Sequence, residues 1–227
     1  MSVIIILVEP QMGENIGAAA RAMKNFGLSE MRIVKPRDGW PNAAAESMAV
    51  GAIDILHSAK IFSDLKAAIT DIETLYASTA QLRDMHKPVT SCHNLKLSNA
   101  NTGIMFGREN NGLSNEEISY ADAILQIETV ADFSSLNIAH AVAVICHQLF
   151  AKADGDQVQQ DLASKGDLEY FLQNLEQQLE ANNFFKVIEK KPLMRRNMRN
   201  IFTRNQLSKT ELQTLHGMIA ALTRQDH

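Results

Sequence analysis

The sequence Phe106-Gly-Arg-Glu-Asn-Asn-Gly-Leu113 follows the apolar run Gly103–Phe106 and brings two glycines and two charged residues directly after it. A short apolar run bounded by glycine is typical of a buried strand that ends in a loop. Ligands of open α/β sheets bind at the carboxyl ends of the strands. We therefore predict a binding loop in which Gly107 allows a close backbone approach and Glu109 accepts hydrogen bonds or contacts a ligand. A plain tight loop is the alternative.

The motif Asn15-Ile-Gly-Ala-Ala-Ala-Arg21 also lies between an apolar run and a helical pattern, and Gly13 and Gly17 are expected to shape the loop. It lacks the glycine pattern of dinucleotide loops and the Gly-Lys-Ser/Thr of P-loops. Arg21 is expected about one turn inside the helix, on the face of Gly17, where alanines clear the space around it. An arginine in that position suits a phosphate or a developing oxyanion, and an ordinary salt bridge is the alternative.

The third motif is Ser134-Ser-Leu-Asn137, a polar stretch before a helix of small residues. A serine nucleophile is disfavoured, because the sequence has neither Gly-x-Ser-x-Gly nor a recognisable acid partner. The structural alternative is a helix cap formed by Ser134 or Ser135, with Asn137 as its partner.

The order of these elements predicts an α/β fold with a mostly parallel sheet and helices on both faces. The expected strands are Val3–Val8, Met31–Val34, Thr74–Ala77, Gly103–Phe106 and Ala123–Ile127. The expected helices among them are Asn15–Phe26, Ala43–Leu56, Ser63–Ile69, Asn115–Tyr120 and Leu136–Lys152. Gly27 is expected to end the first helix, and Ser114 to cap the fourth.

The composition changes after the last of these helices, where the chain becomes polar and loses clear periodicity. We predict a main domain over residues 1–152, a linker over 153–166 and a helical C-terminal extension over 167–227. The expected helices of the extension are Asp167–Ala181, Leu193–Thr203 and Ser208–Thr223, the last with a capping box at its start. The extension is too small for a core of its own, so we expect it to pack on the main domain or on a second subunit.

Positive charge is concentrated in the extension, although the whole chain has a formal net charge of −4. Between Phe184 and Lys209, eight lysines and arginines stand against Glu189 alone, a net of +7. Such asymmetry indicates a polyanionic partner, and a solvated basic helix face is the alternative. The residues that we assign to contacts with such a polyanion are Arg83, Lys190, Lys191, Arg195, Arg196, Arg199 and Arg204.

Several classes of protein are disfavoured by what the sequence lacks. No apolar run is long enough for a membrane span, and the first residues have no basic segment typical of a signal peptide. Cys92 and Cys146 do not make a disulfide framework, and no Cys and His spacing typical of a metal site occurs. We expect a cytoplasmic protein with free thiols, no metal and no membrane partner.

In their order, spacing and placement, the three motifs resemble the signatures of the SPOUT superfamily of RNA 2′-O-methyltransferases, over about residues 3–149. Within it the chain is most similar to the bacterial TrmJ-type enzymes, which methylate tRNA at anticodon-loop nucleotide 32. The stretches that carry this narrower resemblance are Ala22–Gly27, Ser78–Arg83, Leu113–Glu117, Asn197–Arg204 and Glu211–Gly217. The resemblance implies a trefoil-knotted sheet, S-adenosylmethionine as cofactor, a homodimer and tRNA as substrate.

The resemblance also implies roles for individual residues, carried over by position. The cofactor would be held by Ser78, Thr79, Ala80, Gly107, Ile127, Ser134, Ser135 and Leu136. Arg21 would be catalytic, and Asn15, Glu109 and Asn137 would shape the site. The chain departs from the family pattern at Gln81, Ala131 and Phe133. The first departure affects the choice of target, and the other two affect the geometry of the cofactor loop.

Three other functions are compatible with parts of the sequence. One is an RNA-binding protein of the same fold that has lost catalysis, and another is a methyltransferase that acts on a different tRNA or rRNA site. The third is a nucleotide-dependent enzyme of flavodoxin-like shape, in which the basic extension would have no role. The intact Arg21 and both glycine-bearing loops favour the tRNA ribose 2′-O-methyltransferase.

Overall fold

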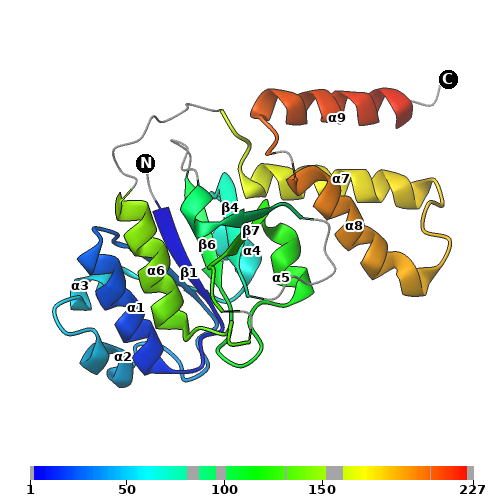
Figure 1. Ribbon diagram of the computed structural model, residues 1–227. Helices are drawn as coiled ribbons and strands as arrows, with labels where there is room; N and C mark the ends of the chain where they lie inside the picture. The colour runs from blue at the N-terminus through cyan, green and yellow to red at the C-terminus, as the bar shows by residue number, and fades with distance from the viewer. Residues whose placement is uncertain are drawn as a thin grey trace.

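A seven-stranded sheet in which every pair of neighbouring strands is parallel forms the centre of the molecule (Figure 1). The computed structural model describes residues 3–80, 87–95, 101–130, 132–151, 161–204 and 206–223. The strand order is β3-β2-β1-β6-β4-β7-β5. The five expected strands are β1 (Val3–Val8), β2 (Glu30–Val34), β4 (Thr74–Ser78), β6 (Thr102–Phe106) and β7 (Ala123–Gln126). The predicted α/β class with a parallel sheet is therefore confirmed.

Two edge strands, β3 (Lys60–Phe62) and β5 (Val89–Ser91), were not predicted from the sequence. Each has only three residues, none of them fully buried, so neither leaves an apolar run that sequence patterns can detect. Both lie at the two ends of the strand order, where an element needs only one hydrogen-bonded neighbour.

Most of the expected helices are present in the first part of the chain. They are α1 (Gly13–Asn25), α2 (Ala43–Met48), α3 (Ile53–Ser58), α4 (Leu65–Ile69), α5 (Asn115–Tyr120) and α6 (Ile138–Ala151). Ser114 and Glu117 form the capping box of α5, and Gly27 has the positive φ of 72° that ends a helix. The single helix expected at Ala43–Leu56 is wrong. It is two helices, because Gly51 turns the chain with a φ of 78°.

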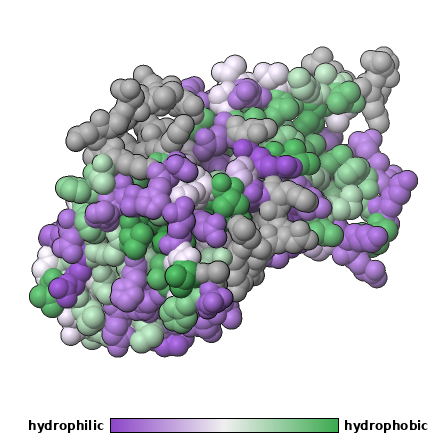
Figure 2. Space-filling view, in the orientation of Figure 1, coloured by the Kyte–Doolittle hydropathy of each residue, from purple (hydrophilic) through white to green (hydrophobic). Residues whose placement is uncertain are grey.

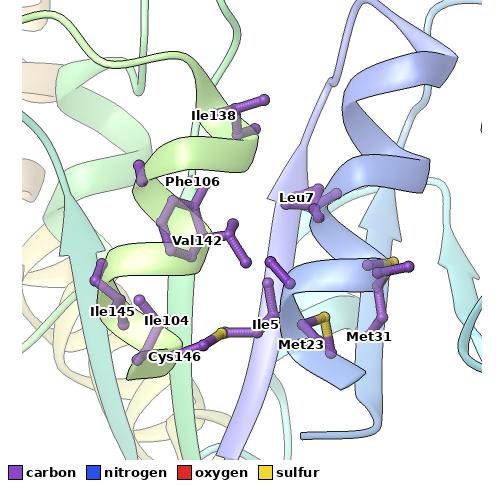
Figure 3. Close-up of a cluster of buried hydrophobic side chains, with 14 of the residues drawn as sticks. Ile5, Leu7, Met23, Met31, Ile104, Phe106, Ile138, Val142, Ile145 and Cys146 are labelled. Atoms are coloured by element: carbon purple, nitrogen blue, oxygen red, sulfur yellow. The ribbon is translucent and has the colours of Figure 1, made fainter. Parts of the chain in front are cut away.

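The sheet is covered on both faces, and alternate residues of each strand face opposite cores (Figure 1). Ile5 and Leu7 of β1 pack with α1 and α6, whereas Ile4 and Ile6 pack toward α4 and α5. Figure 3 shows the first core, in which residues of α1, β1, β6 and α6 interlock. This buried layer fixes the two long helices, α1 and α6, side by side along the sheet.

Gly13 and Gly17 pack helix against helix, which differs from the expectation that they shape a loop. Both lie inside α1, four residues apart. A Cβ atom on Gly13 would lie 2.1 Å from Oδ1 of Asn42, and one on Gly17 would lie 2.2 Å from the carbonyl oxygen of Ala45. Glycine is required at both positions because α2 approaches α1 so closely.

The C-terminal extension consists of α7 (Lys165–Ala181), α8 (Lys191–Thr203) and α9 (Lys209–Thr223), which lie together beside the sheet (Figure 1). Its small core surrounds Phe171 and includes Leu212 of α9. The predicted capping box of α9 is present between Ser208 and Glu211. Residues 153–160, which are the greater part of the predicted linker, lie outside the described residues. Among the described helices none combines the length and the apolar character needed to cross a bilayer.

The extension is attached where β4 and β7 begin. The backbone N–H of Lys165 donates to the carbonyl oxygen of Ile72 at 2.7 Å, just before β4. The ammonium of Lys165 is paired with Asp122, which directly precedes β7, and both side chains are buried. Asp122 also accepts the backbone N–H of Leu75 at 2.7 Å. A buried ion pair therefore joins the extension to the side of the sheet where the amino-terminal ends of the strands lie.

A second buried amine lies in the same interface. Lys87 donates hydrogen bonds to the carbonyl oxygen of Ser119 at 2.9 Å and to the hydroxyl of Thr203 in α8 at 2.7 Å. Burial lowers the pKa of Lys87 to about 7, although the nearby Asp122 acts in the opposite direction. The three-donor ammonium is well matched to carbonyl and hydroxyl acceptors, so Lys87 fastens α8 to the main domain.

We expect Asp122→Asn to destabilise the protein strongly, because it leaves the Lys165 ammonium buried without its carboxylate. Removing one partner of a buried ion pair costs about 3–5 kcal/mol. Urea unfolding followed by circular dichroism measures the loss. Asp38→Asn is the matched control, since its partner Arg37 is exposed and such pairs contribute little. Equal stability of the two variants would contradict the role assigned to the buried pair.

Candidate active site

A cavity of about 650 Å³ opens at the carboxyl ends of β4, β6 and β7. This volume lies within the range of about 300–1,000 Å³ typical of small-molecule sites. The residues that line it are Ser78, Thr79, Ala80, Phe106, Gly107, Arg108, Glu109, Asn110, Asn111, Gly112, Ser114, Ile127, Ser134, Ser135, Leu136, Ile138 and Ala141. All eight residues that the sequence assigned to the cofactor are among them, so the structure brings the predicted cofactor residues together. Their individual roles stay predictions.

Much of the wall is irregular backbone. Ile127 follows the end of β7, and Ser134, Ser135 and Leu136 precede α6, outside helices and strands. Backbone N–H and C=O groups of such segments are not used by the sheet ladder, so they can bond a ligand. Phe133, one of the departures from the family, is exposed, whereas Gln81 and Ala131 lie outside the described residues.

Gly107 is needed for a close approach of the chain to itself. A Cβ atom there would lie 2.2 Å from the carbonyl carbon of Gly112 and 2.3 Å from the backbone nitrogen of Leu113. The loop therefore folds back onto the end of β6, closed by a hydrogen bond of 2.8 Å from the N–H of Gly112 to the carbonyl oxygen of Arg108. The close backbone approach predicted at Gly107 is present, and the backbone that approaches Gly107 belongs to the same loop, at Gly112 and Leu113.

Arg108 clamps this loop from one side. Its guanidinium donates to Glu9 at 2.8 Å, to Glu117 at 2.9 and 3.1 Å, and to the carbonyl oxygen of Gly112 at 3.3 Å. These partners belong to the end of β1, the capping box of α5 and the far side of the loop. One planar side chain therefore holds three segments in register, as a guanidinium with its fork of donors can.

The charges of this clamp stabilise one another. The hydrogen bonds to Glu117 and Glu9 raise the pKa of Arg108 above its ordinary value. Burial acts to raise the pKa of Glu117, but the hydrogen bonds from Arg108 and Ser114 keep it below its ordinary value. Both groups are therefore ionised near neutral pH, and the bonds among them are charge-assisted.

Glu109, the next residue, holds the loop from the other side. Its carboxylate accepts the backbone N–H of Gln11 at 2.9 Å and of Met12 at 3.3 Å, and the Nδ2 group of Asn15 at 2.8 Å. Asn137 donates to Oδ1 of Asn15 at 2.9 Å. The three residues predicted to shape the site, one from each motif, thus form a single hydrogen-bonded chain. Asn137 also accepts the N–H of Ala139 at 2.9 Å, so Asn137 caps α6 and neither serine does.

Arg21 is not brought into this cavity. The helix begins at Gly13, so Arg21 is eight residues into α1 and about 12 Å along its axis, deeper than the one turn expected. Its side chain is exposed and is absent from the cavity wall. Within one chain, therefore, the predicted catalytic arginine and the predicted cofactor residues are apart.

The basic residues assigned to RNA fall into two groups. Lys191 and Arg195 of α8 form ion pairs with Glu176 of α7, and Lys191 also pairs with Glu180. Arg199 pairs with Glu169 and stacks over the ring of Tyr120 at 4.3 Å from its centre, so it docks α8 onto the main domain. The second group consists of Lys190, Arg196 and Arg204, which form no ion pair with any described residue. Arg83 lies outside the described residues.

Sequence reasoning did not assign a role to Arg108. Its partners Glu9 and Glu117 lie 99 and 9 residues away along the chain, and only the folded sheet brings them together. The available signal was its place between Gly107 and Glu109 inside the motif. No cluster of three or more His, Cys, Asp or Glu side chains among the described residues could hold a metal ion.

The comparisons with known proteins cover both parts of the chain. The SpoU rRNA Methylase family matches residues 2–147, and the family described as tRNA methyltransferase TrmJ, C-terminal domain, matches residues 166–227. A crystal structure of TrmJ from Z. mobilis ZM4 superposes with a TM-score of 0.91 and 36% identity, over 99% of this chain and 100% of that one. The trefoil knot expected from the resemblance is implied by this shared fold.

Two curated proteins are similar over nearly the whole chain. The tRNA (cytidine/uridine-2′-O-)-methyltransferase TrmJ of Escherichia coli K12 is 32% identical, over 98% of this chain and 95% of that protein. The tRNA (cytidine/uridine/adenosine-2′-O-)-methyltransferase TrmJ of Pseudomonas aeruginosa UCBPP-PA14 is 30% identical, over 95% of this chain and 91% of that protein. The similarity therefore includes the extension as well as the sheet.

We predict that Arg108→Lys weakens binding of S-adenosylhomocysteine about tenfold, because one ammonium cannot bond Glu9, Glu117 and Gly112 together. A charge-assisted hydrogen bond contributes about 1.5–3 kcal/mol, and its loss frees the loop that lines the cavity. Calorimetry measures the Kd, and Arg37→Lys, which changes an exposed pair, is the control. A wild-type Kd in Arg108→Lys, with lower stability alone, would limit Arg108 to a structural role.

Proposed function

Since this chain belongs to the SpoU rRNA methylase family, we propose that it transfers a methyl group from S-adenosylmethionine to a ribose 2′-hydroxyl of tRNA. The observation that carries the proposal is that two of the motifs line one cavity and that Glu109 in its wall is hydrogen-bonded to Asn15 of the remaining motif, which in turn is bonded to Asn137. The names of the E. coli and P. aeruginosa relatives support tRNA as the substrate and the 2′-oxygen as the acceptor.

The residues of the cavity fit this cofactor. An adenosine needs apolar walls and backbone hydrogen-bonding groups, and the cavity offers Phe106, Ile127 and Leu136 beside irregular backbone. A methionine moiety needs small polar neighbours, which Ser78 and Thr79 provide at the end of β4. The volume of about 650 Å³ is sufficient for a ligand of that size.

S-adenosylmethionine, when bound, supplies an activated methyl group on a sulfonium sulfur. Held by the residues that line the cavity, it would supply this methyl group to the ribose oxygen and leave as S-adenosylhomocysteine, and the hydroxyl proton would pass to water or to a substrate phosphate. The chain contributes position and electrostatics. Arg21 aligns the ribose and stabilises the forming alkoxide, because a guanidinium keeps its positive charge and is a poor base.

We infer that Arg21 acts in a homodimer, in which the exposed face of α1 and α6 meets a partner subunit. Arg21 is exposed and does not line the cavity of its own chain, so it can act on a ribose only next to the cavity of a second subunit. Val144 and Phe150 are exposed apolar side chains of α6, the helix that packs against α1, and a partner would cover them. A two-fold contact of this kind uses the same face twice. Sedimentation at micromolar concentration that gives a monomer would contradict the dimer.

We propose nucleotide 32 of the anticodon loop as the target, on the resemblance to TrmJ-type enzymes, and the cytoplasm as the place of the reaction. The name of the E. coli relative includes cytidine and uridine, and that of the P. aeruginosa relative includes adenosine as well, so the two names do not fix which nucleoside this chain methylates. A catalytically silent RNA-binding protein is disfavoured, because the hydrogen-bonded chain of the three motifs is complete.

The function is tested by tritium transfer from S-adenosylmethionine to unmodified tRNA transcripts, followed by mapping of the methylated ribose. We expect one ribose to be labelled, at nucleotide 32. Labelling of another nucleotide would correct the target and leave the enzyme class intact. Binding of tRNA without any transfer would identify the silent RNA-binding protein instead.

Arg21→Ala should lower kcat by 10²- to 10³-fold, because an arginine at the reacting oxygen lowers the activation barrier by about 3–4 kcal/mol. The Kd for S-adenosylhomocysteine should stay nearly unchanged. Arg21→Lys should fail as well, because a point charge does not replace the planar fork. Lys24→Ala, three residues on in the same helix, is the matched control and should be near wild type. A wild-type rate in Arg21→Lys would show the assigned role to be wrong.

A further inference from the structure

The turn between α7 and α8 exposes an unusual number of apolar side chains. Phe184 is 46% exposed, Val187 44% and Ile188 84%, and Leu193 in the first turn of α8 is 48% exposed. Figure 2 shows green and purple residues alternating at this end of the molecule, on the right of the view. Clusters of exposed apolar residues rimmed by polar ones mark interaction sites in soluble proteins.

The ring of Phe184 is held in a defined position. Asn183 ends α7 with a φ of 56°, and the backbone N–H of Phe184 donates to the carbonyl oxygen of Leu179 at 2.9 Å. Phe184 meets the ring of Phe185 edge to face, with centres 5.2 Å apart. Phe185 in turn lies under the ammonium of Lys191, at 5.5 Å. The exposed ring is therefore fixed before any partner arrives, which lowers the entropy cost of stacking on it.

The same turn carries a net positive charge, with Lys186 and Lys190 against the single carboxylate of Glu189. Lys186 and Lys190 are exposed and form no ion pair within the described residues, whereas Lys191 is paired with Glu176 and Glu180. The acidic residues of α7 thus neutralise the cations along the flank of α8 and leave those of the turn free. An exposed ring and two free ammonium groups lie within seven residues of one another.

This combination fits single-stranded or looped RNA. Every base has a face that stacks on an aromatic ring, and each is flanked by phosphates that lysines contact. A purely apolar partner would leave the two ammonium groups unpaired, and a purely anionic one would leave the ring in water. Resting on the proposed function, we infer that an unstacked base of the tRNA lies on Phe184 while Lys186 and Lys190 contact its neighbouring phosphates.

The turn is remote from the methyl-transfer cavity. α7 has 17 residues, which makes it about 25 Å long, and its first residue is anchored at the start of β4. The cavity lies at the opposite ends of the strands. The base held by Phe184 is therefore a different one from the base whose ribose is methylated in the cavity of the same chain, and the turn selects the tRNA by a second contact.

The test measures the Kd of an unmodified tRNA transcript in the presence of S-adenosylhomocysteine, at several salt concentrations. Phe184→Leu keeps an apolar residue at the helix end and removes the ring, and we expect its Kd to rise roughly tenfold with an unchanged salt slope. Phe184→Tyr should restore wild-type binding. Lys186→Gln with Lys190→Gln should lower the log–log salt slope by about 1.4–1.8, since each phosphate contact contributes about 0.7–0.9.

Two control variants match these changes. Tyr170→Leu removes an exposed ring from α7, the helix that precedes Phe184, and Lys60→Gln removes a charge from the edge strand β3. Both should bind tRNA like wild type, and kcat at saturating tRNA should be unchanged in every variant. Wild-type Kd in Phe184→Leu would overturn the inference, and so would loss of the dimer in sedimentation, which would make the turn a subunit contact. If wild-type protein neither binds nor methylates tRNA, the proposed function itself fails.

Discussion

The carboxylate of Glu109 joins the segments on which the active site depends. The start of α1 has no side-chain cap of its own, because Met12 offers no acceptor. The carboxylate of Glu109, from a loop 98 residues further along the chain than Gln11, accepts the backbone N–H of Gln11 and of the N-cap residue Met12, and it lies at the positive end of the helix dipole. The same carboxylate bonds Asn15, which bonds Asn137 at the start of α6. The hydrogen bonds of this one carboxylate therefore connect the start of α1, the start of α6 and the loop that carries Glu109.

Local features could be predicted from the sequence because local interactions produce them. The capping boxes at Ser114 and Ser208, the helix end at Gly27 and the five buried strands each depend on residues close together in the chain. The position of the cavity also followed, since parallel strands bring their carboxyl ends to one edge. The eight cofactor residues came from the resemblance, and they do line that cavity.

The features that sequence reasoning missed depend on partners far away in the chain. Gly13 and Gly17 read as loop glycines because nothing in their own segment indicates the approach of Ala45 in α2. Arg108 had no visible role without Glu9, which is 99 residues away. The basic stretch looked uniformly free, although Glu176 pairs with Arg195 and Lys191 across two helices. Spacing reveals a helix face, but it does not reveal what packs against that face.

The two ends of the parallel strands have different roles. The extension is fastened where β4 and β7 begin, through Lys165 and Asp122, and the cavity opens where the same strands end. The strands of the sheet lie between these two places. The two ends can therefore diverge at different rates in evolution: a lineage can acquire a new helical extension, and with it a new range of RNA partners, without rebuilding the loops that surround the methyl donor.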